Sequence, residues 1–187
     1  MTDDTQPPHS EETRASILDQ LAYLAREADA LEQIIGEVPD AVLTERPPSG
    51  DDWSIKETFA LLARLDEAVY PRWVERIASE DEPRLDPPDE EALLAAGDDG
   101  ADWNAHDITN LMERVQEARK AFVGMLQELP PRMWKREAIF GDGDDPDRRD
   151  VYAITRDVVR RDYDRLRRMT RRLHESELSA AGHDVPR

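Results

Sequence analysis

Residues 46–57 read RPPSGDDWSIKE, and this stretch decides where a long helix begins. Its prolines and glycine are typical of a turn, so they place the helix start after them. Ser54 is followed three residues later by Glu57, which is the spacing of a capping box at a helix N-terminus. The stretch therefore predicts a turn, a cap at Ser54 and then an apolar helix.

Apolar residues recur at steps of three and four in four long segments, which is the pattern of amphipathic helices. In chain order they are Ile17, Leu21, Leu24, Ala28, Leu31, Ile35 and Val38; Ile55, Phe59, Leu62, Val69, Trp73 and Ile77; Ile108, Leu111, Val115, Ala118, Phe122, Met125 and Leu129; and Val151, Ile154, Val158, Leu166, Met169 and Leu173. No segment alternates with period two for long enough to predict a strand. Pro71 removes a backbone donor inside the second helix and predicts a kink near Tyr70. The fold class is therefore all-α.

The connections between these helices are unequal in length. The second, roughly residues 79–103, is long and rich in Pro, Asp and Glu, as a bundle with a crossover between helices two and three requires. The third, residues 141–147, is rich in Gly and Asp and predicts a mobile loop. We expect a disordered acidic N-terminus over 1–11, one mostly antiparallel four-helix bundle domain over 12–178, and a frayed C-terminus over 179–187.

The composition excludes several classes of protein. A chain of 187 residues without cysteine can bury the core of one domain, but has no disulfide, no thiolate metal site and no cysteine nucleophile. A net charge of −18 argues against a nucleic-acid partner. No apolar run approaches the roughly 20 residues needed to span a bilayer, and the acidic N-terminus lacks the pattern of a signal peptide. We therefore expect an acidic cytoplasmic protein with neither membrane nor nucleic-acid contacts.

The stretch at 46–57 resembles the start of the second helix in the DinB/YfiT-like superfamily of bacterial four-helix bundles. In that superfamily an Arg-Pro turn and a Trp-Ser cap introduce the helix. Two other features agree: Trp103 precedes a helix that ends in a Leu-Pro turn, and residues 161–165 read RDYDR on the last helix. The resemblance covers about residues 12–175 and implies a DinB-like four-helix bundle.

The resemblance also implies a metal site, and this chain departs from it. Members of the superfamily typically bind a divalent metal through three histidines. One lies eight residues after the Trp of the Trp-Ser pair, and two lie four apart on the last helix with an Asp after the first. These positions hold Leu61, Arg161 and Arg165 here, and only Asp162 matches. Leucine has no donor atom and arginine stays protonated, so we expect neither a metal nor another cofactor.

Arginines at these positions need negatively charged partners in the interior of the bundle. Arg161 and Arg165 fall on the inward stripe of the last helix, and Asp66 falls in the corresponding gap of the second helix. Charges on an inward stripe are costly unless they are paired. We therefore expect an internal cluster in which Asp66, with Glu57 or Asp162, neutralises the two arginines.

Other interpretations remain open. Trp134 follows the Leu-Pro turn and is interpreted either as packing at the bundle end or as part of the pocket mouth. Arg161 and Arg165 can instead line an open pocket for a small anionic ligand. A metal-dependent thiol transferase or hydrolase with non-standard ligands is the third alternative, while the lost histidines favour a protein that is not an enzyme. Superfamily members often pair through bundle faces, so we expect a homodimer, which Tyr23 and Ile34 on the first helix weakly support.

Overall fold

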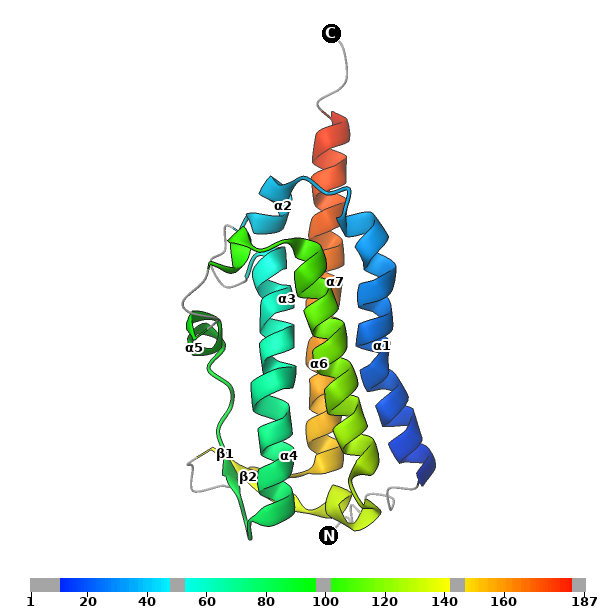
Figure 1. Cartoon of the computed structure of the whole chain (residues 1–187), viewed down its shortest axis with the longest axis vertical. Helices are drawn as coiled ribbons and strands as arrows, with labels where there is room; N and C mark the ends of the chain where they lie inside the picture. The colour runs from blue at the N-terminus through cyan, green and yellow to red at the C-terminus, as the bar shows by residue number, and fades with distance from the viewer. Residues whose placement is uncertain (1–10, 48–52, 97–101, 142–146, 183–187) are drawn as a thin grey trace, which may run out of the picture.

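The computed structural model describes residues 11–47, 53–96, 102–141 and 147–182. Four long helical segments form a bundle (Figure 1). They are α1 (Glu11–Ile35); α3 (Ile55–Arg64), which continues through a π-helical turn (Leu65–Val69) into α4 (Tyr70–Ser79); α6 (Ile108–Glu128); and α7 (Val151–Gly182). The all-α four-helix bundle predicted from the apolar stripes is confirmed.

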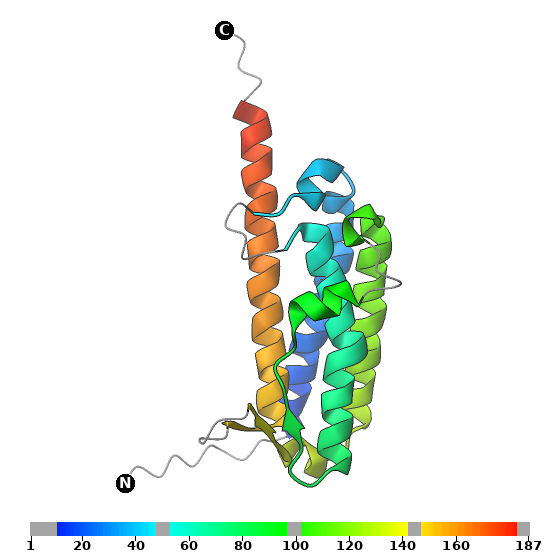
Figure 2. The same ribbon diagram turned by 90° about the vertical axis from the view of Figure 1, so that its left-hand side faces the viewer.

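The four long helical segments run in two directions, and the long second connection makes two consecutive segments parallel. α1 and α7 run one way, while α3–α4 and α6 run the other way (Figure 1). α6 packs against α1 and α3, and α7 packs against α1 and α3. The long second connection returns the chain to the starting end of α3, so α6 runs parallel to α3–α4. α7 projects past the other helices (Figure 2) and continues to Gly182, although fraying was predicted from 179.

The start predicted for the second helix at Ser54 matches the structure. The Ser54 hydroxyl accepts the Glu57 amide at 3.0 Å, and the Glu57 carboxylate accepts the Ser54 amide at 2.9 Å. This is the reciprocal capping box expected from the sequence. α6 begins after Asp107, whose carboxylate accepts the Thr109 amide at 2.8 Å.

The kink predicted at Pro71 takes the form of a π-helical turn. Tyr70 donates its backbone N–H to Leu65, five residues earlier, instead of four. Pro71 then lies in the first turn of α4, directly after the point where the hydrogen-bond register changes. Asp66, the second residue of this turn, lies in the bundle interior, with 1% of its surface exposed.

The connections contain short elements that the sequence did not reveal. Between α4 and α6 lie β1 (Arg84–Leu85), α5 (Glu90–Ala95) and a 3-10 turn (Trp103–Ala105); between α6 and α7 lie a 3-10 turn (Pro131–Lys135), β2 (Glu137–Phe140) and β3 (Asp147–Asp150); and α2 (Asp40–Thr44) follows α1. β2 pairs in parallel with β1 and antiparallel with β3. The expectation of no strand was wrong, because strands of two to four residues are too short to show a period. The predicted loop at 141–147 lies mostly outside the described residues.

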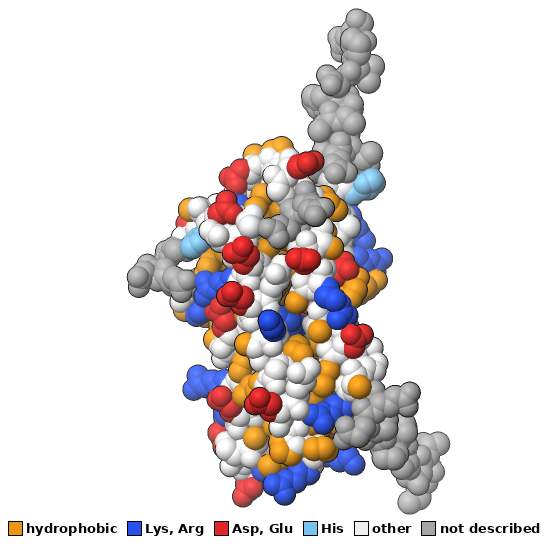
Figure 3. Space-filling view, turned by 45° about the vertical axis from the view of Figure 1, so that its right-hand side comes forward, with side chains coloured by type: hydrophobic (Ala, Val, Ile, Leu, Met, Phe, Trp, Pro, Cys, Tyr) orange, Lys and Arg blue, Asp and Glu red, His pale blue; other side chains and the backbone are white. Residues whose placement is uncertain are grey.

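The surface is charged with mixed sign. Acidic and basic side chains are interspersed on the face of the molecule in Figure 3, without a large patch of one sign. In the described part of the chain, no helix has both the length and the apolar character that crossing a bilayer requires.

Candidate functional site

The positions at which the resemblance places metal-binding histidines lie on α3 and α7, which contact each other. Leu61 on α3 is fully buried in the apolar core. On α7, Arg165 is buried and Arg161 is half-buried. None of these three side chains can donate an electron pair to a metal, so the position does not fit a divalent cation.

The centre of the bundle holds an arginine from a third helix. Arg119 on α6 is 1% exposed and binds Asp66 through two hydrogen bonds, Nε–Oδ2 at 2.6 Å and Nη2–Oδ1 at 3.0 Å. Its Nη1 lies 2.8 Å from Oδ2 of Asp162 on α7. Two buried carboxylates from α7 and the π-helical turn therefore share one guanidinium.

Arg165 extends this cluster toward the crossover. Its Nη2 binds the carboxylate of Glu90 on α5, and its Nη1 lies 4.0 Å from Oδ1 of Asp162. The side chain of Arg165 is 8% exposed, whereas that of Glu90 is 34% exposed. The guanidinium of Arg165 is thus bound by a carboxylate that reaches in from the surface.

Several polar atoms in this region have no hydrogen-bond partner among the described residues. They are the Tyr70 hydroxyl, both carboxylate oxygens of Asp162 and Nη1 of Arg165. The contact between Asp162 and Arg119 is an ion pair without the alignment of a hydrogen bond. Buried polar atoms are nearly always satisfied in folded proteins, so the unpaired atoms mark this part of the bundle as a candidate site.

Burial dominates the protonation of the cluster. Burial raises the pKa of Asp66 to about 7, although the positive charge of Arg119 acts in the opposite direction. Burial also raises the pKa of Asp162, against the charges of Arg119 and Arg165. Burial lowers the pKa of Arg119, but the negative charges of Asp162 and Asp66 outweigh burial, so the pKa of this guanidinium is raised. One buried cation does not fully compensate two buried carboxylates.

The pairing predicted for Asp66 was wrong. Asp66 binds Arg119 rather than Arg161 or Arg165. Arg161 makes no ion pair with any other residue that the structure describes, and acts on Asp162 only through its charge. The rotation of α7 about its axis explains this pairing. It turns Asp162 toward Arg119 on α6 and turns Arg165 toward Glu90 on α5.

Glu57 and Trp134 lie outside this cluster. Glu57 caps α3 and binds Arg46, Nε–Oε2 at 2.8 Å; although burial raises the pKa of Glu57, hydrogen bonds from Arg46 and Ser54 lower it below its usual value. Trp134 is fully buried, with its ring centroid 4.7 Å from that of Tyr152. Trp134 therefore belongs to the packing at the bundle end, and its interpretation as part of a pocket mouth was wrong.

Sequence reasoning missed Arg119, and a signal for it existed. Arg119 follows Val115 by four residues and precedes Phe122 by three, so it falls on the apolar stripe of α6. Met112 and Leu126, one heptad before and after it, are both buried. A charged residue at such a position predicts a buried ion pair.

A comparison with protein families assigns the chain. The sequence pattern of the DinB superfamily matches residues 23–156, which is more than half of the chain. The chain belongs to the DinB superfamily. Leu61, Arg161 and Arg165 occupy the positions at which the resemblance implies metal-binding histidines.

One solved structure of another protein is similar to this chain in fold. It is described as "YfiT from Bacillus subtilis is a probable metal-dependent hydrolase with an unusual four-helix bundle topology", and it matches with a TM-score of 0.72 and 17% identity over 92% of each chain. Among curated proteins, none matches this sequence. Within the described residues, no group of three or more His, Asp or Glu side chains could hold a metal ion.

Proposed function

We propose that this chain is a metal-independent DinB-like bundle protein without metal-dependent hydrolase activity. In this proposal a guanidinium–carboxylate cluster takes the place of the superfamily's metal centre. The observation that carries it is the state of Arg165, which is buried at a former ligand position and is bound by Glu90. A divalent cation cannot enter beside this guanidinium without strong charge repulsion.

The carboxylates that could serve as non-standard metal ligands are Glu57, Asp66 and Asp162, and each of them lies against an arginine. Glu57 caps α3 and Asp66 accepts two hydrogen bonds from Arg119. Asp162 faces the same guanidinium at 2.8 Å. Metal-dependent hydrolysis, as described for YfiT, would need these groups to be released from their cations, so the geometry favours a metal-independent protein.

We expect purified protein to carry no divalent metal after incubation with excess zinc or nickel and removal of unbound ions. Elemental analysis should find far less than one metal per chain. Metal at close to one per chain would contradict the proposal.

A variant that restores the superfamily pattern provides the control. In the triple variant L61H/R161H/R165H, two cations are removed and three imidazoles are placed at the ligand positions. Because Asp162 and Glu90 then lack the charge of Arg165, a divalent cation should compensate them. We expect this variant to bind zinc or nickel at close to one per chain, which shows that the assay detects a site in this bundle.

The anion-binding alternative depends on Arg161, because Arg165 is already bound by Glu90. Arg161 is half-buried and has no carboxylate partner among the described residues. We expect a panel of phosphate, sulfate and citrate at equal ionic strength to change Tm by the same amount, within about 1 °C, in wild type and Arg161→Gln. A stabilisation seen in wild type but lost in the variant would instead favour a small-anion site.

A further inference from the structure

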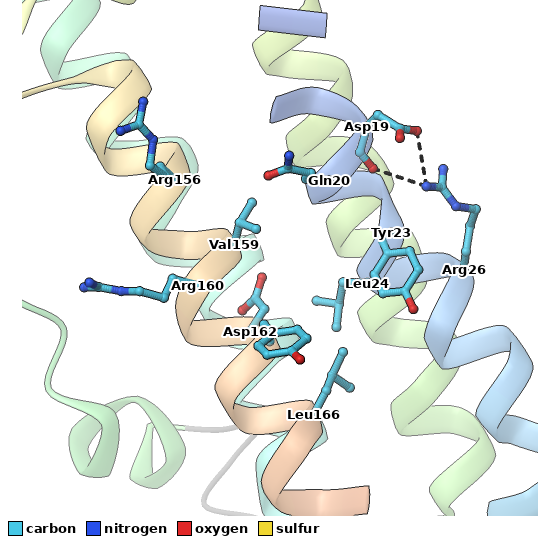
Figure 4. Close-up of a pocket in the computed structure, with 11 residues that line it drawn as sticks. Asp19, Gln20, Tyr23, Leu24, Arg26, Arg156, Val159, Arg160, Asp162 and Leu166 are labelled. Carbon is cyan, nitrogen blue, oxygen red and sulfur yellow. Dashed lines mark hydrogen bonds and ion pairs between the residues drawn. The ribbon is translucent and has the colours of Figure 1, made fainter. Parts of the chain in front are cut away.

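A groove of about 400 Å³ lies between α1 and α7 and is lined by residues of these two helices. Its walls are mostly apolar, with Leu24 of α1 opposite Val159 and Leu166 of α7 (Figure 4). Tyr23 stands at the edge of the groove and is 47% exposed. Concave apolar walls with a few polar groups are the usual form of a small-molecule site.

The polar group of this groove is Asp162. Figure 4 shows its carboxylate projecting from α7 into the space between the two helices. The side chain is 5% exposed, and neither oxygen accepts a hydrogen bond from a described residue. Nη1 of Arg119 lies 2.8 Å from Oδ2, and Nη1 of Arg165 lies 4.0 Å from Oδ1. Oδ1 is therefore a buried acceptor without a donor, beside an apolar groove.

The mouth of the groove carries three arginines, Arg26, Arg156 and Arg160, and one carboxylate, Asp19. Arg26 is paired with Asp19 at 3.2 Å, and Arg160 with Asp157 at 3.3 Å. The carboxylate of Asp157 is shared with a second arginine, and Arg156 has no ion pair among the described residues. These cations lie at the rim, whereas the buried charged group that lines the floor is the carboxylate of Asp162.

We propose that the groove between α1 and α7 binds a small amphipathic amine. Its apolar body lies between Leu24 and Leu166, and its ammonium group donates to Oδ1 of Asp162. A buried carboxylate favours an ammonium over a hydroxyl donor, because a hydrogen bond between opposite charges is roughly twice as strong as a neutral one. A carboxylate in the same place is repelled by Asp162. The site shares Asp162 with the guanidinium–carboxylate cluster, but it does not depend on that cluster excluding a metal.

The test uses three probes of one shape: 2-phenylethylamine, 2-phenylethanol and 3-phenylpropionate. Titration of the full-length protein, followed by calorimetry or by chemical shifts, should give the tightest binding for the amine and none for the carboxylate. In Asp162→Asn the preference for the amine over the alcohol should fall at least tenfold. A protein that binds amine and alcohol equally well, before and after this substitution, would overturn the assignment of Asp162.

A second variant keeps the proposal testable if Asp162→Asn disturbs the fold. Val159→Trp fills the groove without changing the ion-pair cluster, and should weaken amine binding at least tenfold. Leu93→Trp places the same side chain in a separate hollow beside α4 and should leave binding unchanged. Equal binding by wild type and Val159→Trp would place the amine elsewhere and overturn the proposal. Light scattering gives a second outcome that would overturn the proposal. If wild type has twice the chain mass of 21.4 kDa and Val159→Trp is a monomer, a second copy of the chain covers the groove.

Discussion

Arg119→Met is expected to lower the free energy of unfolding by about 3–5 kcal/mol, the loss typical of removing one partner from a buried ion pair. Methionine fills much of the arginine volume, so the expected loss is electrostatic rather than due to a cavity. Asp66 and Asp162 remain in the interior without the cation that both contact. Chemical denaturation monitored by circular dichroism measures the change.

Compensating substitutions separate charge from packing. In the triple variant R119M/D66N/D162N no charge is left unpaired at the centre of the bundle, so most of the lost stability should return. Lys120→Met is the matched control, because Lys120 is the next residue on α6 and is exposed; its effect should be within about 0.5 kcal/mol. A loss below about 1 kcal/mol in Arg119→Met would mean that the buried pair does not stabilise the fold.

The sequence was sufficient for the bundle but not for the pairing inside it. Helix stripes and caps are local features, so the positions of Ser54 and Pro71 could be interpreted without knowing any neighbour. Asp66 was also correctly expected to face inward. Its partner could not be deduced, because the choice among Arg119, Arg161 and Arg165 depends on how α6 and α7 are rotated about their axes.

The rest of the candidate site depends on contacts between distant parts of the chain. Glu90 reaches Arg165 across 75 residues, from a short helix inside the crossover. Nothing in the sequence around Glu90 distinguishes it from the other acidic residues of that connection. The groove likewise exists because α1 and α7 lie side by side, a relation set by the topology of the bundle.

Asp66→Asn is expected to remove part of the pH dependence of stability between about pH 4 and pH 7. The folded-state pKa of Asp66 is raised to about 7, whereas an unfolded aspartate has a pKa of about 3.9. Between these values the folded state holds more protons than the unfolded state. The stabilisation from the bound proton is therefore complete below about pH 4 and is lost as the pH rises through about 7.

The difference in stability between the variant and wild type isolates this group from all other carboxylates. Asparagine imitates the protonated acid, so the difference should be constant below about pH 4. It should then shift in favour of Asp66→Asn by up to about 4 kcal/mol by pH 8, at no more than about 1.4 kcal/mol per pH unit.

Asp147→Asn gives a control of opposite sign. A hydrogen bond from Arg149 lowers the pKa of Asp147, so its stabilisation is present above about pH 4 and is lost only in more acidic solution. The difference between Asp147→Asn and wild type should thus be flat from pH 5 to pH 8, where that of Asp66→Asn changes most. Flat curves for both variants would mean that Arg119 keeps Asp66 ionised throughout. In that case the bidentate hydrogen bonds, rather than burial, would set the charge at the centre of the bundle.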